Sequence, residues 1–198
     1  GMLGDSPLLP ESLEEVALLG KRLADVAFEA IYCSTSKRAR TTAETIASYL
    51  IKPAPIHYTD GLRELGLGCL EGQLIDEVSE EHPIQLDYLR NRLDLYDPRA
   101  FAGESIQDAL ARIETVVADA VMQHEGPLLF VGHGASLTAA IQWLAGKDLA
   151  HLREMGGLVN NSLTMMVAQE PQKLTPYDLV VYNDASFLGE SAGRDALL

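Results

Sequence analysis

Arg38 follows a group of hydroxyl residues at a point where an apolar strand pattern changes into a helical one. The stretch YCSTSKRAR (32–40) places Ser34, Thr35 and Ser36 where they can cap a helix, with Arg38 in its first turn. Free N–H groups and the helix dipole attract anions there, and a guanidinium offers phosphate oxygens a planar pair of donors. The stretch therefore predicts an anion-binding helix start. An ordinary hydroxyl cap followed by solvated arginines fits the same residues.

A single histidine, His133, stands between two glycines directly after the apolar run LLFV (128–131). Glycines let the backbone and a ligand approach closely, so the imidazole can point out of the strand end. Other sites fit poorly: a dinucleotide-binding loop needs a glycine where Leu137 stands, and a nucleophile elbow needs serine in place of the histidine. No partner residues have the spacing of a zinc site. A capped structural histidine is the alternative interpretation.

A third candidate is Glu64, which lies beside Arg63 in the glycine-rich stretch 60–72. A carboxyl group in such a loop can act as a general acid if its surroundings tune its pKa. An exposed ion pair between Arg63 and Glu64 is the other interpretation of the same two residues.

The elements that would position these residues alternate between strands and helices. Strands are predicted at 28–33, 54–59, 127–133, 160–170 and 177–184, and helices at 10–26, 34–50, 103–126 and 135–146. The polar stretch 73–102 is predicted to be a small, partly helical excursion. This order indicates one α/β domain over residues 1–198, with a mostly parallel central sheet flanked by helices. Ligands of such sheets bind at the carboxyl ends of the strands, and the continuous apolar strand 127–133 is expected in a central position.

Size and charge restrict the possible partners. The chain has 198 residues and a formal net charge of −14, which disfavours nucleic acids and anionic membranes as partners. An anionic substrate must therefore be captured by a local positive site. Two cysteines are too few for a disulfide framework, which favours a reducing compartment. No apolar run reaches the about 18 residues of a membrane span and no signal peptide is recognised, so a cytoplasmic protein is expected.

Six stretches, in order along the chain, resemble motifs of the histidine phosphatase superfamily, also called the phosphoglycerate mutase-like family. They are GDSPLLPES (4–12), IYCSTSKRARTTAETI (31–46), LRELGLGCLEG (62–72), AGESIQDALARI (102–113), LLFVGHGASL (128–137) and YNDASFL (182–188). In the last of them Phe187 stands where the family commonly has histidine. One such stretch would be a weak signal, whereas six in the family's order cover nearly the whole chain. The resemblance implies a three-layer phosphoglycerate mutase-like fold.

The resemblance also implies a role for each candidate residue. Arg38 would bind the phosphoryl oxygens, and His133 would donate to the same oxygens as charge develops. Glu64 would protonate the leaving alcohol. Ser34 and Gly134 would add contacts to the phosphoryl group. Phosphoryl transfer needs mainly positioning and positive charge around the oxygens, so no metal or other cofactor is expected.

One part of the family pattern is absent from this sequence. The family opens with a strand ending in Arg-His-Gly, whose histidine becomes phosphohistidine, and no such triplet occurs here. We therefore expect very low turnover by this chain. In the family this first strand lies beside the strand that ends at His133, and its loss would leave buried backbone groups unpaired, each costing about 1–3 kcal/mol. We expect a neighbouring chain, a rearranged segment or residues not represented here to fill that position, unless the sheet is built differently.

The function implied by the resemblance is a phosphomonoester phosphatase that acts on a small phosphorylated substrate through a phosphohistidine intermediate. A phosphoglycerate mutase is one alternative, and a non-catalytic relative that binds a phospho-ligand or a protein partner is another. The modest excursion at 73–102 favours a phosphatase, because mutases usually carry longer insertions. Arg90, Arg92 and Arg99 lie in that excursion and are either contacts for the non-reacting end of the substrate or solvated surface charges. A homo-oligomer is left open.

Overall fold

The structure, a computed structural model, describes residues 2–3, 6–189 and 193. The strands are β1 (Ala30–Ser34), β2 (Ile56–Thr59), β3 (Leu128–Val131), β4 (Leu163–Val167) and β5 (Asp178–Asp184). The α-helices are α1 (Pro10–Leu23), α2 (Lys37–Tyr49), α3 (Ile75–Glu81), α4 (Pro83–Asn91), α5 (Ile106–Gln123) and α6 (Gly134–Leu144). Short 3-10 helices are η1 (Asp60–Leu62), η2 (Gly68–Leu70), η3 (Leu93–Leu95), η4 (Pro98–Phe101) and η5 (Leu149–His151).

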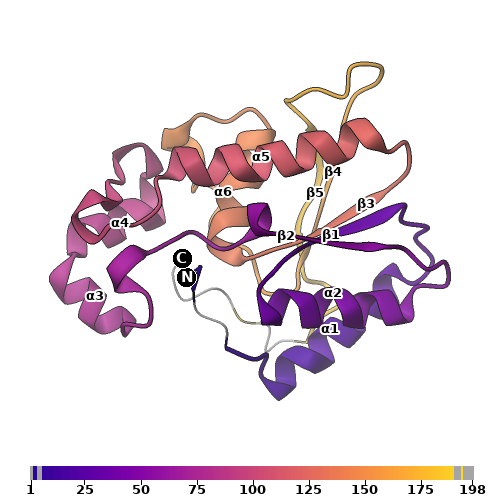
Figure 1. Cartoon of the computed structure of the whole chain (residues 1–198), viewed down its shortest axis with the longest axis horizontal. Helices are drawn as coiled ribbons and strands as arrows, with labels where there is room; N and C mark the ends of the chain where they lie inside the picture. Colours follow the sequence, from indigo (N-terminus) through magenta and orange to yellow (C-terminus); the bar gives the residue numbers. More distant parts are fainter. Residues whose placement is uncertain (1, 4–5, 190–192, 194–198) are drawn as a thin grey trace.

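A three-stranded parallel sheet with the order β2-β1-β3 organises the molecule. Tyr32 on β1 is paired with His57 on β2 and with Phe130 on β3. Helices α1 and α2 cover one face of this sheet, and α5 and α6 lie on the other (Figure 1). The prediction of an α/β fold with helices flanking a mostly parallel sheet is confirmed.

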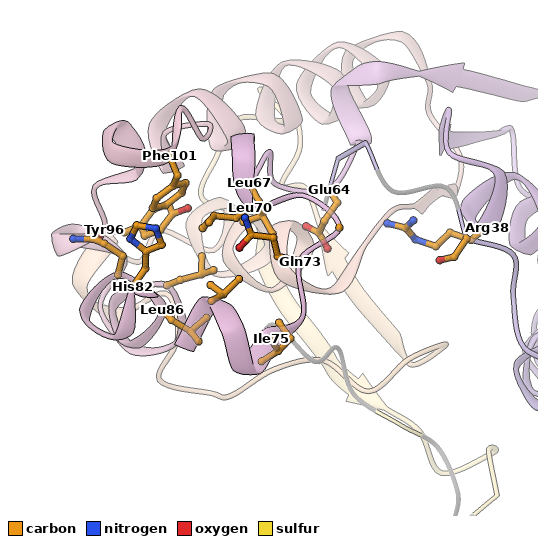
Figure 2. Close-up of a pocket in the computed structure, with 15 residues that line it drawn as sticks. Arg38, Glu64, Leu67, Leu70, Gln73, Ile75, His82, Leu86, Tyr96 and Phe101 are labelled. Atoms are coloured by element: carbon orange, nitrogen blue, oxygen red, sulfur yellow. The ribbon is translucent and has the colours of Figure 1, made fainter. Parts of the chain in front are cut away.

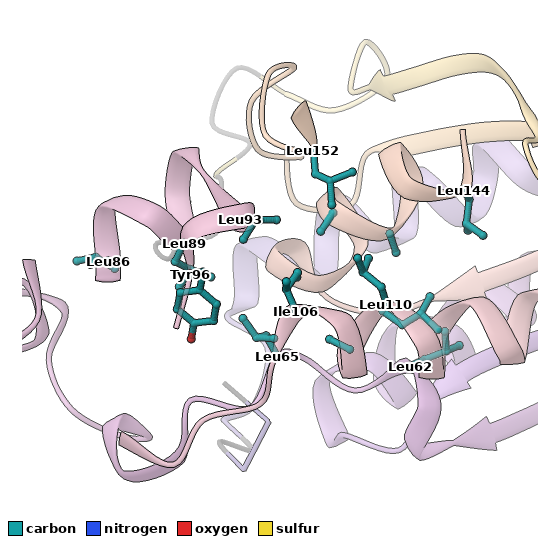
Figure 3. Packing of buried hydrophobic residues seen from close by; sticks show 14 of the residues in the cluster. Leu62, Leu65, Leu86, Leu89, Leu93, Tyr96, Ile106, Leu110, Leu144 and Leu152 are labelled. Atoms are coloured by element: carbon teal, nitrogen blue, oxygen red, sulfur yellow. The ribbon is translucent and has the colours of Figure 1, made fainter. Parts of the chain in front are cut away.

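The alternation of side chains along β1 explains why both faces are covered. Ile31 and Cys33 are fully buried in a cluster with residues of α1 and α2. Tyr32, between them, points to the opposite face and packs against the second cluster, as a side-chain period of two residues requires. That second cluster joins the loop after β2 to α5, α6 and the excursion (Figure 3), and includes Leu62, Leu65, Leu89, Ile106, Leu110 and Leu144.

The prediction of a central position for the strand 127–133 is wrong within the described residues. β3 pairs only with β1, so it is an edge strand, and Leu128, Leu129 and Phe130 remain half-buried. β4 and β5 form a separate antiparallel pair. No described segment supplies a strand for the free edge of β3, so a rearrangement of the described residues does not fill that position. Filling by a neighbouring chain or by further residues stays a prediction.

The excursion lies at one end of the molecule, beyond the first turn of α5 (Figure 1). It contains α3, α4, η3 and η4. Helix α5 begins where the Ser105 hydroxyl accepts the Asp108 N–H at 3.1 Å. None of the described helices is both long enough and apolar enough to span a membrane.

The two free cysteines differ in burial, which predicts different reactivity. Cys33 on β1 is fully buried, and Cys69 is exposed. Burial raises the pKa of the Cys33 thiol to about 12, with the Glu44 charge acting in the same direction and Arg40 opposing it. The reactive species is the thiolate. Ellman's reagent at mildly alkaline pH should therefore modify Cys69 rapidly and Cys33 only after denaturation. Rapid reaction of both thiols in the native protein would contradict this packing.

Candidate active site

The carboxyl ends of β1 and β3 bring Ser34 and His133 together. Because the register pairs Cys33 with Val131, the residues that follow lie at the same edge of the sheet. Nε2 of His133 lies 2.8 Å from the Ser34 hydroxyl and 3.2 Å from the Ser36 hydroxyl, and all three side chains are buried. Ser36 is the N-cap residue of α2, but its side chain makes no cap hydrogen bond to a helical N–H. Sequence reasoning did not predict its contact with His133.

Arg38 lies in the first turn of α2, two residues after the serine that contacts His133. Its side chain is half-buried and lines a cavity that Glu64 also lines, and Figure 2 shows it extending towards Glu64. Arg40, two residues further along α2, is exposed. Its guanidinium carbon lies 4.6 Å from the centroid of the Tyr58 ring, over which it stacks. Only the first of these two arginines thus faces the candidate site.

The interpretation of Glu64 as half of an exposed ion pair is wrong. Glu64 is only 2 % exposed, and Arg63 instead lies 3.4 Å from the Asp60 carboxylate. One Glu64 oxygen accepts the N–H groups of Leu65 and Ser136 at 2.8 and 2.7 Å, and the other accepts that of Ala135 at 3.1 Å. The carboxylate therefore occupies the positive N-terminal end of α6, next to His133.

Close packing around Gly132 explains why a glycine precedes His133. A Cβ at Gly132 would lie 3.1 Å from Leu137 Cδ1 and 3.4 Å from the carbonyl oxygen of Leu62. The loop that carries Glu64 can thus approach the strand end that carries His133. Gly134 is the first residue of α6. The expectation of a close backbone approach holds at Gly132, although the neighbour there is the protein's own loop.

Arg112 and Glu104 support the Glu64 loop, and sequence reasoning assigned them no role. The Arg112 guanidinium makes a bidentate pair with the Glu104 carboxylate at 2.6 and 2.9 Å. It also donates to three carbonyl oxygens of the loop, those of Gly61, Arg63 and Glu64. Glu104 in turn accepts the Gly66 N–H at 3.0 Å. The available signal was the stretch AGESIQDALARI, which contains both residues.

The cavity beside Arg38 and Glu64 has a volume of about 310 Å³ and extends beneath the excursion. His82, half-buried, lines it, and its ring centroid lies 5.4 Å from that of Phe101. His57 and His124 make ring contacts with Tyr32, and His124 also pairs with Glu29. Among the described residues no group of three or more histidine, cysteine, aspartate or glutamate side chains could hold a metal ion.

The arrangement suits a tetrahedral anion. The His133 imidazole and two serine hydroxyls lie at one strand end, and Arg38 lies in the first turn of the helix that follows that strand. Each of these side chains can donate hydrogen bonds to oxygens. Such donors can hold a phosphoryl group and compensate charge as it develops. Glu64 lines the cavity that Arg38 also lines.

Comparison with known proteins agrees with this architecture. The family model of the histidine phosphatase superfamily (branch 1) matches residues 1–177. A relative from Salmonella paratyphi A, "Probable phosphoglycerate mutase GpmB", is 31% identical over 172 residues, which cover 86% of this chain and 77% of the relative. The structure of Bacillus stearothermophilus YhfR is 32% identical, with a TM-score of 0.82 over 92% of this chain and 87% of that chain.

A further similar structure is more distant in sequence. The mycobacterial glucosyl-3-phosphoglycerate phosphatase Rv2419c, in complex with inorganic phosphate, is 22% identical and has a TM-score of 0.81, covering 96% of this chain and 92% of its own. At that identity the similarity establishes the fold alone. The match of the family model over most of the chain, together with the relative at 31% identity, is sufficient for membership. The chain belongs to the histidine phosphatase superfamily.

Proposed function

We propose that this protein is a phosphomonoester phosphatase that binds the phosphoryl group of a small substrate between Arg38 and His133. The proposal rests on one observation about the site. His133 contacts Ser34 and Ser36 at the carboxyl end of β1, and Arg38, in the helix that follows, lines the same cavity as Glu64. The phosphatase and mutase names among the relatives and similar structures support the same class of chemistry. A cytoplasmic location and independence of metal ions are part of the proposal.

Each residue has a distinct part in the proposed reaction. Arg38 binds two phosphoryl oxygens as a planar fork, and Ser34 and Gly134 lie beside the same group. His133 donates to the phosphoryl oxygens as charge moves towards the leaving oxygen. Glu64 gives a proton to the departing alcohol. The phosphoryl group passes through a phosphohistidine before water releases it, which requires a nucleophilic histidine in an Arg-His-Gly setting.

A second candidate function is the non-catalytic binding of phosphorylated molecules. It is favoured because no Arg-His-Gly triplet occurs in the 198 residues. Without the nucleophile the same site binds phosphorylated molecules and does not turn them over. Hydrolysis of p-nitrophenyl phosphate should therefore be very low for this chain and insensitive to EDTA. A version carrying any residues that the native gene encodes before Met2 distinguishes the two functions. Turnover by that version favours the phosphatase, and continued inactivity favours the binding protein.

The binding step itself can be tested without turnover. Titration calorimetry with inorganic phosphate should give an affinity that falls at least about tenfold in Arg38→Ala and in His133→Ala, because each change removes a hydrogen bond to a charged group. Arg40→Ala is the matched control, since Arg40 lies on the same helix but stacks on Tyr58. Unchanged phosphate binding in Arg38→Ala and His133→Ala would exclude the proposed site.

A further inference from the structure

Arg153 is a buried arginine that has no part in the reaction proposed above. It is 6 % exposed and lies shortly after η5. Its Nε donates to the carbonyl oxygen of Leu89 and its Nη1 to that of Ala135, each at 3.0 Å. Burying a guanidinium costs free energy unless hydrogen bonds compensate, and apolar side chains of similar volume often stabilise a core equally well. The arginine is therefore better explained by the two carbonyl groups that it holds than by packing.

The first of these carbonyl groups belongs to the phosphoryl site. Ala135 is the second residue of α6, and its carbonyl oxygen accepts the hydrogen bond from Arg153. The N–H of the same residue donates to the Glu64 carboxylate at 3.1 Å. His133 is the N-cap residue of this helix. Any shift of the first turn of α6 therefore moves both Glu64 and His133.

The second carbonyl group belongs to the excursion. Leu89 lies in the last turn of α4, where carbonyl oxygens have no partner within the helix and the helix dipole favours a cation. η3, which follows α4, packs against η5, which leads to Arg153. Leu89, Leu93 and Leu152 belong to one buried cluster (Figure 3). The guanidinium thus joins the end of the excursion to the first turn of α6.

We propose that Arg153 is a positioning residue, which fixes the first turn of α6 against the end of α4 and thereby sets the positions of His133 and Glu64. This inference rests on the proposed function, because these positions matter only if a phosphoryl group binds between Arg38 and His133. The end of the excursion and the phosphoryl site are then energetically coupled, and such coupling is reciprocal. Loosening the end of α4 weakens phosphate binding, and bound phosphate stabilises the end of α4.

The effect of Arg153 on the ligand can be measured on the 198-residue chain by titration calorimetry with inorganic phosphate. Arg153→Met keeps an apolar side chain of similar length and removes both hydrogen bonds, and it should lower the phosphate affinity at least about fivefold. Arg153→Lys should recover part of this loss, because an ammonium retains the charge but not the planar pair of donors that reaches two carbonyl oxygens.

Lys173→Met is the matched control, because it also removes a buried cation from a backbone carbonyl group. Lys173 is 9 % exposed, and its Nζ donates to the carbonyl oxygen of His124 at 3.0 Å and pairs with Glu125 at 2.8 Å. His124 precedes β3, so this contact lies at the opposite end of the strand from His133. Lys173→Met should lower the urea midpoint but change the phosphate affinity less than about twofold. Equal losses of phosphate affinity in Lys173→Met and Arg153→Met would overturn the positioning role.

Hydrogen exchange on the unmodified chain tests the reverse direction and requires no variant to fold. Saturating phosphate should slow exchange of the amides in the last turn of α4 by about fivefold, the same factor as the loss of affinity, and should leave β5 unchanged. Exchange in α4 that phosphate does not slow, with phosphate binding still dependent on Arg38, would overturn the role of Arg153 and leave the proposed function standing. Phosphate binding that does not depend on Arg38 would overturn both.

Discussion

Replacing Arg112 with alanine is expected to lower the free energy of unfolding by about 3–5 kcal/mol. The guanidinium uses five hydrogen bonds, two to Glu104 and three to carbonyl oxygens of the loop that carries Glu64. The Arg112 and Glu104 side chains are only 19% and 15% exposed, so alanine would leave a mostly buried carboxylate without its cation. Urea denaturation followed by circular dichroism measures the loss.

The chain contains a matched control for this change. Arg92 also makes a bidentate pair with a carboxylate, that of Asp94, at 2.9 and 2.7 Å, but half of its side chain is exposed to solvent. Arg92→Ala should leave the urea midpoint nearly unchanged, because water screens and replaces such a pair. Arg112→Lys should recover little, since an ammonium cannot reproduce the planar fork. Equal midpoints for Arg112→Ala and Arg92→Ala would show that the loop does not depend on this contact.

The helices and strands were largely predictable from the sequence because their periodicity is local. The apolar spacing before Leu23, the alternation around Tyr32 and the long pattern of α5 each indicate one element. The position of β3 in the sheet was not predictable in this way. A continuous apolar run suggests strands on both sides, whereas the pairing of a strand depends on which other segments reach it. Phe130 is half-buried because only β1 pairs with its strand.

The site was predictable only in its residue types. Strand ends and helix starts indicated Ser34, Arg38 and His133. The geometry brings Ser34 and His133 together at one edge of the sheet, with Arg38 in the first turn of α2. The position of Glu64 depends on contacts of its carboxylate with α6 and of its carbonyl oxygen with Arg112 of α5, which lie 48 to 72 residues away along the chain. No local pattern reports such contacts. The same applies to the cavity, because its lining residues come from helices and loops that are separated along the chain.

Glu64 has a structural role, as a buried hydrogen-bond acceptor at the start of α6, and a proposed role as proton donor. Substitutions at this position can separate the two. Its carboxylate accepts three backbone N–H groups, two of them at the start of α6. Glu64→Ala would leave these buried donors without an acceptor, each at about 1–3 kcal/mol, so the free energy of unfolding should fall by about 3 kcal/mol or more. Glu64→Gln keeps one accepting oxygen but turns an NH₂ group towards a backbone N–H, so roughly half of that loss is expected.

Glu77, a surface carboxylate that accepts a backbone N–H, is the control for the substitutions of Glu64. Glu77 accepts the Leu74 N–H at 3.3 Å in the first turn of α3, on an exposed surface. Glu77→Ala should change the urea midpoint little, because water replaces the carboxylate there. Because Glu64 is proposed to act on the leaving alcohol and not on the phosphoryl oxygens, Glu64→Gln should keep most of the affinity for inorganic phosphate. A Glu64→Ala protein as stable as Glu77→Ala would mean that the loop does not hold the carboxylate at the start of α6, and the proton-donor role would then lose its geometric basis.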